Sequence, residues 1–337
     1  MRAGGVPTLK DVAAAAGVSV MTASNAVNGR PRVAPATRQR VLDAVEALGY
    51  EVNLTARRLR AGRSGTIALA VPRLDHPYFG DLAARFATAL APGGRHLVLE
   101  QTGASKEGEL TALSQARLQM YDGVLLSVVG LQHADVERLQ GDLPLVLLGE
   151  RPMPARFDHV MLGNVEGARL ATAHLLARGA RRVAVVGGAF DEEPGVSSTR
   201  TQGWREAHEA AGVPVDERLV LPAPALEMAQ GRAAVDRALA EGLALDAVFA
   251  VTDQVAMGAL AALHSHGRSV PGDVQVVGFD ALSLGEHLWP ALTTVDPRHD
   301  LLVEHALRLL DRRASGDRAD PEHLVLPVRL LERASTR

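Results

Sequence analysis

The sequence of 337 residues contains no cysteine, so it offers neither a disulfide framework nor thiolate chemistry. No apolar run approaches the roughly 20 residues that cross a bilayer, and the first residues lack the pattern of a signal peptide. Hydrophobic residues make up 47% and charged residues 22%, the balance of an ordinary globular protein. We therefore expect a soluble, cytoplasmic protein with no membrane partner, long enough for two or more domains.

The short motifs of several enzyme classes are also missing. Neither G-x-G-x-x-G nor G-x-x-x-x-G-K-[ST] occurs, so a nucleotide-phosphate cradle is not indicated. G-x-S-x-G and H-E-x-x-H are absent as well. His264 and His266 are two positions apart, a poor spacing for one helix face, which favours a surface helix end over a metal site. We expect no catalytic activity, no cofactor and no bound metal.

Charge is distributed unevenly along the chain. Residues 1–63 hold ten basic and four acidic residues, a net charge of +6, whereas the other 274 residues hold 26 basic and 35 acidic residues, a net charge of −9. A basic segment on an acidic body suggests a polyanionic partner for that segment. The charge alone is equally compatible with an ordinary solvated surface.

The first fifty residues carry the signals of three short helices. Thr8 and the acid three positions later resemble a capping box at the start of the first helix. Gly17 supplies a tight turn, and Ser19 is a suitable N-cap for the second helix. A third helix is predicted over 35–48. Three short helices with a glycine turn between the first two make a helix-turn-helix unit, a DNA-binding motif.

The stretches TLKDVAAAAGVSVMTASNAVNG, TRQRVLDAVEALGY and ARRL resemble the head of the LacI (lactose/galactose repressor) family of bacterial transcription regulators. PALTTV at 290–295 and LVLPVRLLERAS at 324–335 resemble the closing motifs of that family. The resemblance covers nearly the whole chain. It implies an N-terminal all-α helix-turn-helix head with a hinge helix, joined to an α/β periplasmic-binding-protein-like core of two parallel-sheet lobes.

In that family the second helix of the head lies in the major groove of DNA. Its exposed early positions here are Val20 and Met21, with Asn25 one turn further on. Asparagine can pair with an adenine edge and apolar groups can contact thymine methyls, so these three are candidate base contacts. Core packing is the alternative for Val20. The polar candidates, which hold phosphates or cap the backbone, are Thr8, Ser19, Thr22, Ser24 and Asn28.

The segment NLTARRLRAGR that follows is too short to be a stable helix in water by itself. The resemblance implies a hinge helix that forms only when two protomers and DNA meet, with Leu59 as a wedge in the minor groove. Packing beneath the head is the alternative for this leucine. The family usually has proline where this chain has Val52, which makes entry to the hinge less rigid. The DNA contacts expected from this segment are Asn53, Ala56, Arg57, Arg58 and Leu59.

After Gly65, short apolar strands alternate with helical stretches. Continuous apolar strands separated by helices predict parallel sheets that are covered on both faces. The strands fall into two series, which predict two similar lobes with a cleft between them. The first series is 66–71, 96–100, 123–129 and 145–149, and the second is 182–188, 247–251 and 274–279.

These patterns define three parts of the chain. We expect a DNA-binding head over 1–50, a hinge helix or linker over 51–63, and an effector-binding and dimerisation core over 64–337. The two lobes of that core exchange segments near the end of the chain. The first lobe is expected to comprise 64–160 and 292–323, and the second 161–291 and 324–337.

Ligands of parallel sheets bind outside the carboxyl ends of the strands, where charged and aromatic residues of this chain gather. The resemblance implies that they hold a small-molecule effector, since carboxylates and arginine pair with neighbouring hydroxyls and an aromatic ring can stack on a sugar. A lobe-bridging salt bridge or a helix cap is the alternative for the arginine and the last aspartate, and core packing for the tyrosine and phenylalanine. The candidates are His76, Tyr78, Phe79, Glu150, Arg200, Asp253 and Asp280.

We therefore predict a homodimeric, sequence-specific DNA-binding transcriptional repressor that is regulated by a small-molecule effector, a sugar or sugar derivative. Its macromolecular partner is expected to be a palindromic double-stranded operator. Ligand binding between the lobes would change the spacing of two hinge helices, which couples the two sites. The alternative is a soluble periplasmic-type solute-binding protein without a DNA role, which the basic head and the missing signal peptide disfavour.

Overall fold

The computed structural model describes residues 7–50, 64–139, 144–151, 153, 156–191 and 194–337. The chain divides into two compact units, a head (Met1–Ser64) and a core (Gly65–Arg337). Within the described ranges, no helix is both long and apolar enough to cross a membrane.

The head is a three-helix unit built on small apolar side chains. Its helices are α1 Leu9–Ala15, α2 Val20–Val27 and α3 Pro35–Leu48, as the sequence predicts. The carboxylate of Asp11 accepts hydrogen bonds from the backbone N–H of Thr8 at 2.9 Å and from its hydroxyl at 2.6 Å. Ser19 Oγ accepts from the N–H of Thr22 at 3.1 Å, so both helix starts are capped by their own sequence. The buried core includes Val12, Ala13, Ala23, Ala26 and Val41.

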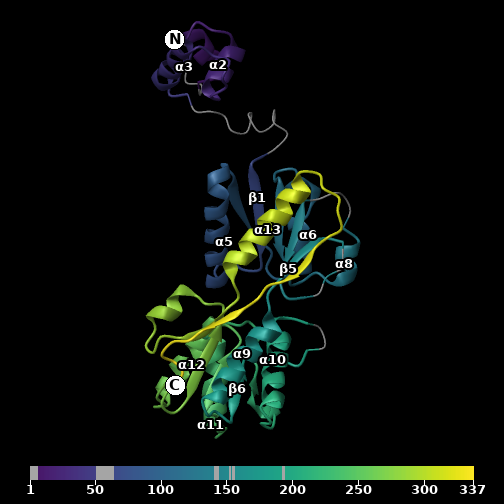
Figure 1. Cartoon of the computed structure of the whole chain (residues 1–337), viewed down its shortest axis with the longest axis vertical. Coiled ribbons are helices and arrows are strands. Elements are labelled where there is room, and N and C mark those ends of the chain that lie inside the picture. Colours follow the sequence, from purple (N-terminus) through teal and green to yellow (C-terminus); the bar gives the residue numbers. More distant parts are fainter. Residues whose placement is uncertain (1–6, 51–63, 140–143, 152, 154–155, 192–193) are drawn as a thin grey trace. The chain divides into compact units, whose positions relative to one another are not determined.

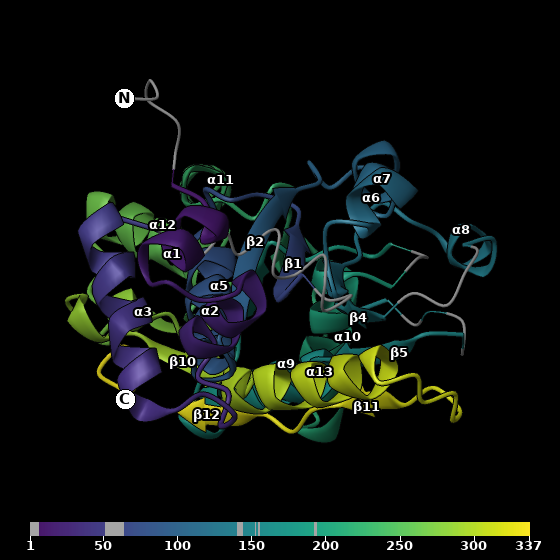
Figure 2. The same cartoon turned by 90° about the horizontal axis from the view of Figure 1, so that it is seen from above.

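The first lobe of the core is a six-stranded parallel sheet of order β11-β5-β4-β3-β1-β2. One face packs against α5 and α13 and the other against α6, α7 and α8, and Figure 2 shows α13 and α6–α8 on opposite sides of the sheet. The strands are β1 Thr66–Val71, β2 His96–Gln101, β3 Gly123–Ser127, β4 Leu145–Leu148, β5 Asp158–Met161 and β11 His323–Val325. The helices are α5 Pro77–Leu90, α6 Lys106–Ala112, α7 Gln115–Leu118, α8 His133–Glu137, α13 His299–Ala314 and the short η1 Ala91–Gly93.

The second lobe has the sheet order β12-β10-β9-β8-β6-β7, in which only β12 runs antiparallel to its neighbour. Helix α9 packs beside α10, and α11 beside α12. Gly203 permits the first of these approaches, since a Cβ there would lie 2.1 Å from the carbonyl oxygen of Val165. The strands are β6 Val183–Val186, β7 Val220–Leu221, β8 Ala247–Ala250, β9 Gln275–Phe279, β10 Thr293–Asp296 and β12 Arg329–Leu331. The helices are α9 Asn164–Ala177, α10 Val196–Ala210, α11 Met228–Ala240, α12 Asp253–Ser265, η2 Glu217–Leu219 and η3 Ser283–His287.

The chain crosses between the lobes three times, after β5, β10 and β11, and Figure 1 shows the last crossing as a yellow segment. The lobe boundaries expected near 291 and 323 are therefore wrong. Strand β10 pairs with β9, so the second lobe extends to residue 296, and β11 pairs with β5, so the first lobe continues past residue 323. Both strands are short, and β10 reads TTVD, which is not an apolar run.

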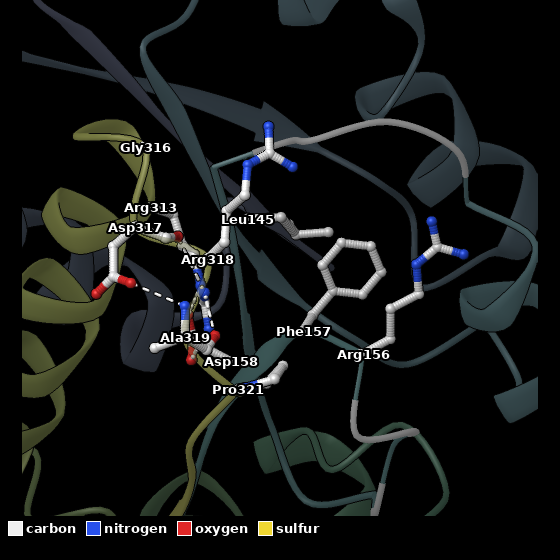
Figure 3. Close-up of a pocket in the computed structure, with 10 residues that line it drawn as sticks. All are labelled: Leu145, Arg156, Phe157, Asp158, Arg313, Gly316, Asp317, Arg318, Ala319 and Pro321. Atoms are coloured by element: carbon white, nitrogen blue, oxygen red, sulfur yellow. Dashed lines mark hydrogen bonds and ion pairs between the residues drawn. The ribbon is translucent and has the colours of Figure 1, made fainter.

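A buried carboxylate joins α13 to this first sheet. Asp158, at the start of β5, is fully buried and accepts hydrogen bonds from Arg312 Nη2 at 2.8 Å and Arg313 Nε at 2.6 Å. It also accepts from the backbone N–H of Glu322 at 2.8 Å, immediately before β11. Figure 3 shows Asp158 and Arg313 on one side of a cavity of about 310 Å³, with Phe157 on the other. The carboxylate therefore fixes both the end of α13 and the start of β11.

Replacing Asp158 should cost far more stability than replacing an exposed partner of the same helix. Asp158→Ala leaves two arginines without their buried counter-charge, and we expect the free energy of unfolding to fall by about 3–5 kcal/mol. Asp311→Ala removes an exposed pair with Arg95 and should cost about 1 kcal/mol or less. Urea titration of both variants measures the difference, and equal losses would contradict the role given to Asp158.

Candidate DNA-contact helix and ligand cavity

Helix α2 exposes large apolar side chains that the head does not use for its own packing. Met21 is 75% exposed and Val20 is 40% exposed. Val27 of the same helix packs on the head core, but Val20 and Met21 do not. Val20 is therefore an exposed residue and not a core residue. Asn25 is half-buried, and its side-chain amide makes no hydrogen bond to another residue within the described ranges. Three side chains of α2 are thus available to a partner.

The polar candidates around α2 cap the two ends of the helix. Ser19 Oγ lies 2.9 Å from Thr22 Oγ1 as well as accepting from the Thr22 N–H. At the other end, Asn28 Nδ2 donates to the carbonyl oxygen of Ser24 at 2.7 Å and lies 3.3 Å from its Oγ. These bonds position α2, and contact of the same groups with phosphate stays a prediction.

The hinge candidates lie outside the described residues. They are Asn53, Ala56, Arg57, Arg58 and Leu59. Their proposed contacts with DNA stay predictions from the sequence.

The core holds a cavity of about 370 Å³ between its lobes, at the carboxyl ends of strands from both sheets. This is the position that the parallel topology predicts for a ligand. Six of the seven predicted effector residues line the cavity, and the seventh, Asp253, does not. The six are His76, Tyr78, Phe79, Glu150, Arg200 and Asp280.

Arg200 of α10 is the most buried cation of the cavity, with 2% of its surface exposed. Its Nε donates to Asn164 Oδ1 at 2.8 Å, and its Nη1 donates to the carbonyl oxygen of Val251. Nη1 also lies 3.4 Å from Asp280 Oδ1, and the guanidinium lies over the ring of Phe279, 3.5 Å from its centroid. The ion pair exists, but both partners belong to the second lobe, so it does not bridge the lobes. Nη2 makes no hydrogen bond to the described residues and remains available as a donor.

Asp280 stands at a strained turn that Asp253 supports. Asp280 and Ala281 have φ values of 114° and 53°, conformations that cost a non-glycine residue about 1–3 kcal/mol each. Asp253 Oδ2 accepts from the N–H of Leu282 at 2.7 Å, and its Oδ1 accepts from the hydroxyl of Thr294 at 2.6 Å. Asp253 is fully buried, lies outside the cavity lining and has both oxygens engaged, so in this structure it positions Asp280, and its contact with the effector stays a prediction.

Burial raises the pKa values of the carboxyl groups near Arg200. Burial raises the pKa of Asp280 to about 7, and the Arg200 cation opposes that rise. Burial raises the pKa of Glu150 in the same way, again opposed by Arg200. Burial, followed by the negative charge of Asp280, raises the pKa of Asp253 to about 8. Near neutral pH Asp280 can therefore supply an O–H donor as well as an acceptor, which suits hydroxyl-bearing ligands.

The aromatic candidates belong to the cavity and to the core at once. Tyr78 and Phe79, at the start of α5, line the cavity and also pack on the first-lobe core. Their rings meet edge to face, with centroids 4.9 Å apart, and the ring of His299 meets that of Tyr78 edge to face, with centroids 5.2 Å apart. Burial, followed by the charges of Glu150 and Asp280, raises the pKa of Tyr78. Burial lowers the pKa of His76, whose buried Nδ1 has no partner within the described ranges.

Several cavity residues were not predicted from the sequence. Ser127 is the last residue of β3 and Thr252 lies two residues after β8, the same signal that identified the other candidates. Arg73 follows β1 and forms an ion pair with Glu227 of the second lobe, while Asp75 accepts from it at 2.7 Å. The apolar part of the lining comes from several elements of the first lobe and includes Leu82, Leu148, Leu162 and Leu302.

In the part of the chain that the structure describes, no group of three or more His, Cys, Asp or Glu side chains is arranged to hold a metal ion. His266 Nε2 instead lies 3.2 Å from Asp236 on neighbouring α11, as expected for a residue at a surface helix end.

A helix-turn-helix head with an exposed second helix, joined to a two-lobed α/β core with a cavity between its sheets, is the architecture of a DNA-binding regulator. Residues 8–53 match the family model for bacterial regulatory proteins of the lacI family, and residues 172–336 match that for a periplasmic binding protein-like domain. The HTH-type transcriptional regulator CelR of Thermobifida fusca is 36% identical over 98% of both chains.

Solved structures agree with this assignment. A transcriptional regulator CelR-cellobiose complex is 35% identical and covers 98% of this chain and 99% of its own, with a TM-score of 0.71. The Lac repressor dimer bound to operator and an anti-inducer covers the same shares with a TM-score of 0.82, and at 24% identity it shows the common fold. The chain belongs to the LacI family and is a DNA-binding transcriptional repressor. The family and the fold class predicted from the sequence are confirmed.

Titration of Asp253 should appear in the pH dependence of stability. The folded chain holds a proton on this group up to about pH 8, whereas a free aspartate releases it near pH 4. The proton held by Asp253 stabilises the folded chain. This stabilisation is complete below about pH 4 and is lost as the pH rises through about 8. Asp253→Asn removes the titration, so variant minus native stability should rise with pH, by at most about 1.4 kcal/mol per pH unit.

Urea titrations of both proteins at about pH 5 and about pH 8 measure this difference. A difference that does not change with pH would show that Asp253 is ionised in the folded core.

Proposed function

We propose that the protein acts in the cytoplasm as a homodimer that represses transcription from a palindromic operator, and that a carbohydrate bound in the core cavity controls this repression. One combination carries the proposal. The same chain presents unpaired base-contact side chains on α2 and encloses a cavity lined by Glu150, Arg200 and Asp280.

Base contact through α2 is supported by the chemistry of its free side chains. Val20 and Met21 offer apolar surface that suits a thymine methyl, and the amide of Asn25 can donate and accept at an adenine edge. The segment with Leu59 would add an apolar wedge in the minor groove of a bent operator.

Exposed apolar side chains on both lobes support a homodimer. Val98 and Leu99 lie exposed on β2, the edge strand of the first sheet, where the open edge favours pairing or burial. In the second lobe, Leu284 of η3 is exposed and Trp289 is fully exposed. A second copy of the chain would cover these side chains on both lobes, and two-fold symmetry would match a palindromic operator.

A carbohydrate effector is supported by the polar groups of the cavity and by one relative. Arg200 Nη2 remains a free donor, and Glu150 and Asp280 supply oxygens around it. Tyr78 and Phe79 present aromatic surface against which a sugar ring can pack. The relative solved with cellobiose shares 35% identity over nearly the whole chain, so cellobiose and related sugars are the first ligands to test.

Communication between the sites would run through the relative positions of the two lobes. The cavity is lined by both lobes, so a ligand that contacts Glu150 in one and Asp280 in the other favours one arrangement of them. The first lobe also receives the chain from the head, where the N–H of Gly65 donates to the carboxylate of Asp122 at 2.7 Å. A change in lobe arrangement in each protomer would alter the spacing of the two linkers.

Selection of DNA from a random oligonucleotide pool should return palindromes. Asn25→Ala should then relax the preference at one position in each half-site and cost about 1–3 kcal/mol of specific binding, because one paired base contact is lost. Fluorescence anisotropy with matched and mismatched operators measures both effects.

Arg57→Ala is the control for this experiment, because loss of a phosphate contact should weaken binding to all sequences and lower the salt dependence. Enrichment of single asymmetric half-sites would refute the dimeric arrangement.

Conservative changes in the cavity should separate ligand binding from DNA binding. Asp280→Asn and Glu150→Gln keep side-chain shape but remove a carboxylate, and we expect each to weaken sugar binding by about 1–3 kcal/mol. Operator affinity without ligand should stay at the native value. Anisotropy titrations with operator, in the presence of cellobiose and a panel of other sugars, measure the response.

Asp311→Ala, which changes an exposed carboxylate away from the cavity, is the matched control. If the two cavity variants responded to sugar at the native concentration, the ligand site would lie elsewhere.

A further inference from the structure

A second cavity, of about 720 Å³, adjoins the ligand cavity on the side of the second lobe. Glu150 lines both, so the two spaces meet at this residue. Helix α10 separates the remaining linings, because Val196 and Arg200 face the first cavity while other residues of the same helix face the second. A ligand that fills the first cavity and extends past Glu150 would therefore enter the second.

An aromatic side chain stands in this second cavity with much of its surface uncovered. Phe190, in the loop after β6, is 49% exposed. The guanidinium of Arg205, from α10, lies 4.9 Å from the centroid of its ring. This contact holds an arginine fork beside accessible aromatic surface, which suits a ring that is apolar on its faces and carries hydroxyls at its edge.

The charged groups around Phe190 are not used by the fold. Arg205, Asp191 and Glu217 line the cavity, and none of their side chains forms a hydrogen bond or ion pair with another residue in the described ranges. Their neighbours differ, because Thr201 donates to a helix carbonyl and Gln202 donates to Glu206 at 2.8 Å. Free donors and acceptors therefore surround the exposed ring, while the uncharged polar groups already have partners.

We propose that this second cavity is a subsite for a second sugar ring, so that the effector is a disaccharide or a longer glycoside. One ring would occupy the cavity of Arg200 and Asp280, and the next would pack on Phe190. Arg205, Asp191 and Glu217 would bind its hydroxyls, and Glu150 stands where the linkage between the rings passes. The proposal rests on the carbohydrate-binding function proposed above, and it specifies the size of the ligand.

Calorimetric titration of the full-length protein tests the subsite. The probes are glucose, galactose and their methyl β-glycosides, together with disaccharides of these sugars in several linkages. We expect at least one disaccharide to bind about tenfold or more tightly than the corresponding monosaccharide glycoside, because it gains an aromatic contact and several hydrogen bonds. Phe190→Ala should remove most of that gain, and Phe190→Tyr, which keeps the ring, should retain it.

Glu209→Ala is the matched control, because Glu209 is exposed on α10 and lines neither cavity. Thermal unfolding checks that each variant remains folded. Binding of a monosaccharide and its disaccharide with equal affinity, or a gain that survives Phe190→Ala, would overturn the subsite and leave the carbohydrate function standing. If no sugar bound at all, the carbohydrate function itself would fail, and the subsite with it.

Discussion

The buried guanidinium of Arg200 constrains the whole centre of the core. A cation removed from water must be compensated by close partners, because each unpaired buried charge costs several kcal/mol. Arg200 finds them in Asn164 at the start of α9, the carbonyl of Val251 after β8, and Asp280 after β9. The start of α9 and the carboxyl ends of β8 and β9 therefore have to meet at one point. The residues at this point form one wall of the cavity.

The same constraint explains why a carboxylate that does not face the cavity matters to the site. Asp280 approaches Arg200 from a turn with two positive-φ residues, and Asp253 holds that turn through Leu282 and Thr294. The strain of the turn is balanced by buried hydrogen bonds one layer away from the ligand. Burial is the main cause that raises the pKa values of both Asp253 and Asp280.

Much of this arrangement follows from local pattern. The caps of α1 and α2, the apolar strands and the polar residues at strand ends are signals carried by a few neighbouring residues, and six of seven predicted cavity residues lie where expected. The exceptions depend on long-range pairing. Strand β10 reads as polar but is buried between β9 and β12, and Leu302 reaches the cavity from a helix on the other side of a lobe crossing. The sequence placed Asp253 after a strand, like the other candidates. It could not show that the carboxylate accepts a hydrogen bond from Thr294, 41 positions away.

The three crossings between the lobes also bear on the order in which the protein can fold during synthesis. The head needs only its own three helices and can close as soon as they have emerged. The first lobe lacks α13 and an edge strand until residue 325 is made, and the second lacks β10 and β12 until residue 331. Even Ser335 is fully buried, where its hydroxyl joins β9 to β10 through Val276 and Thr293. A nascent chain therefore carries a finished DNA-binding unit well before it carries a finished ligand site, and the two lobes become complete almost together.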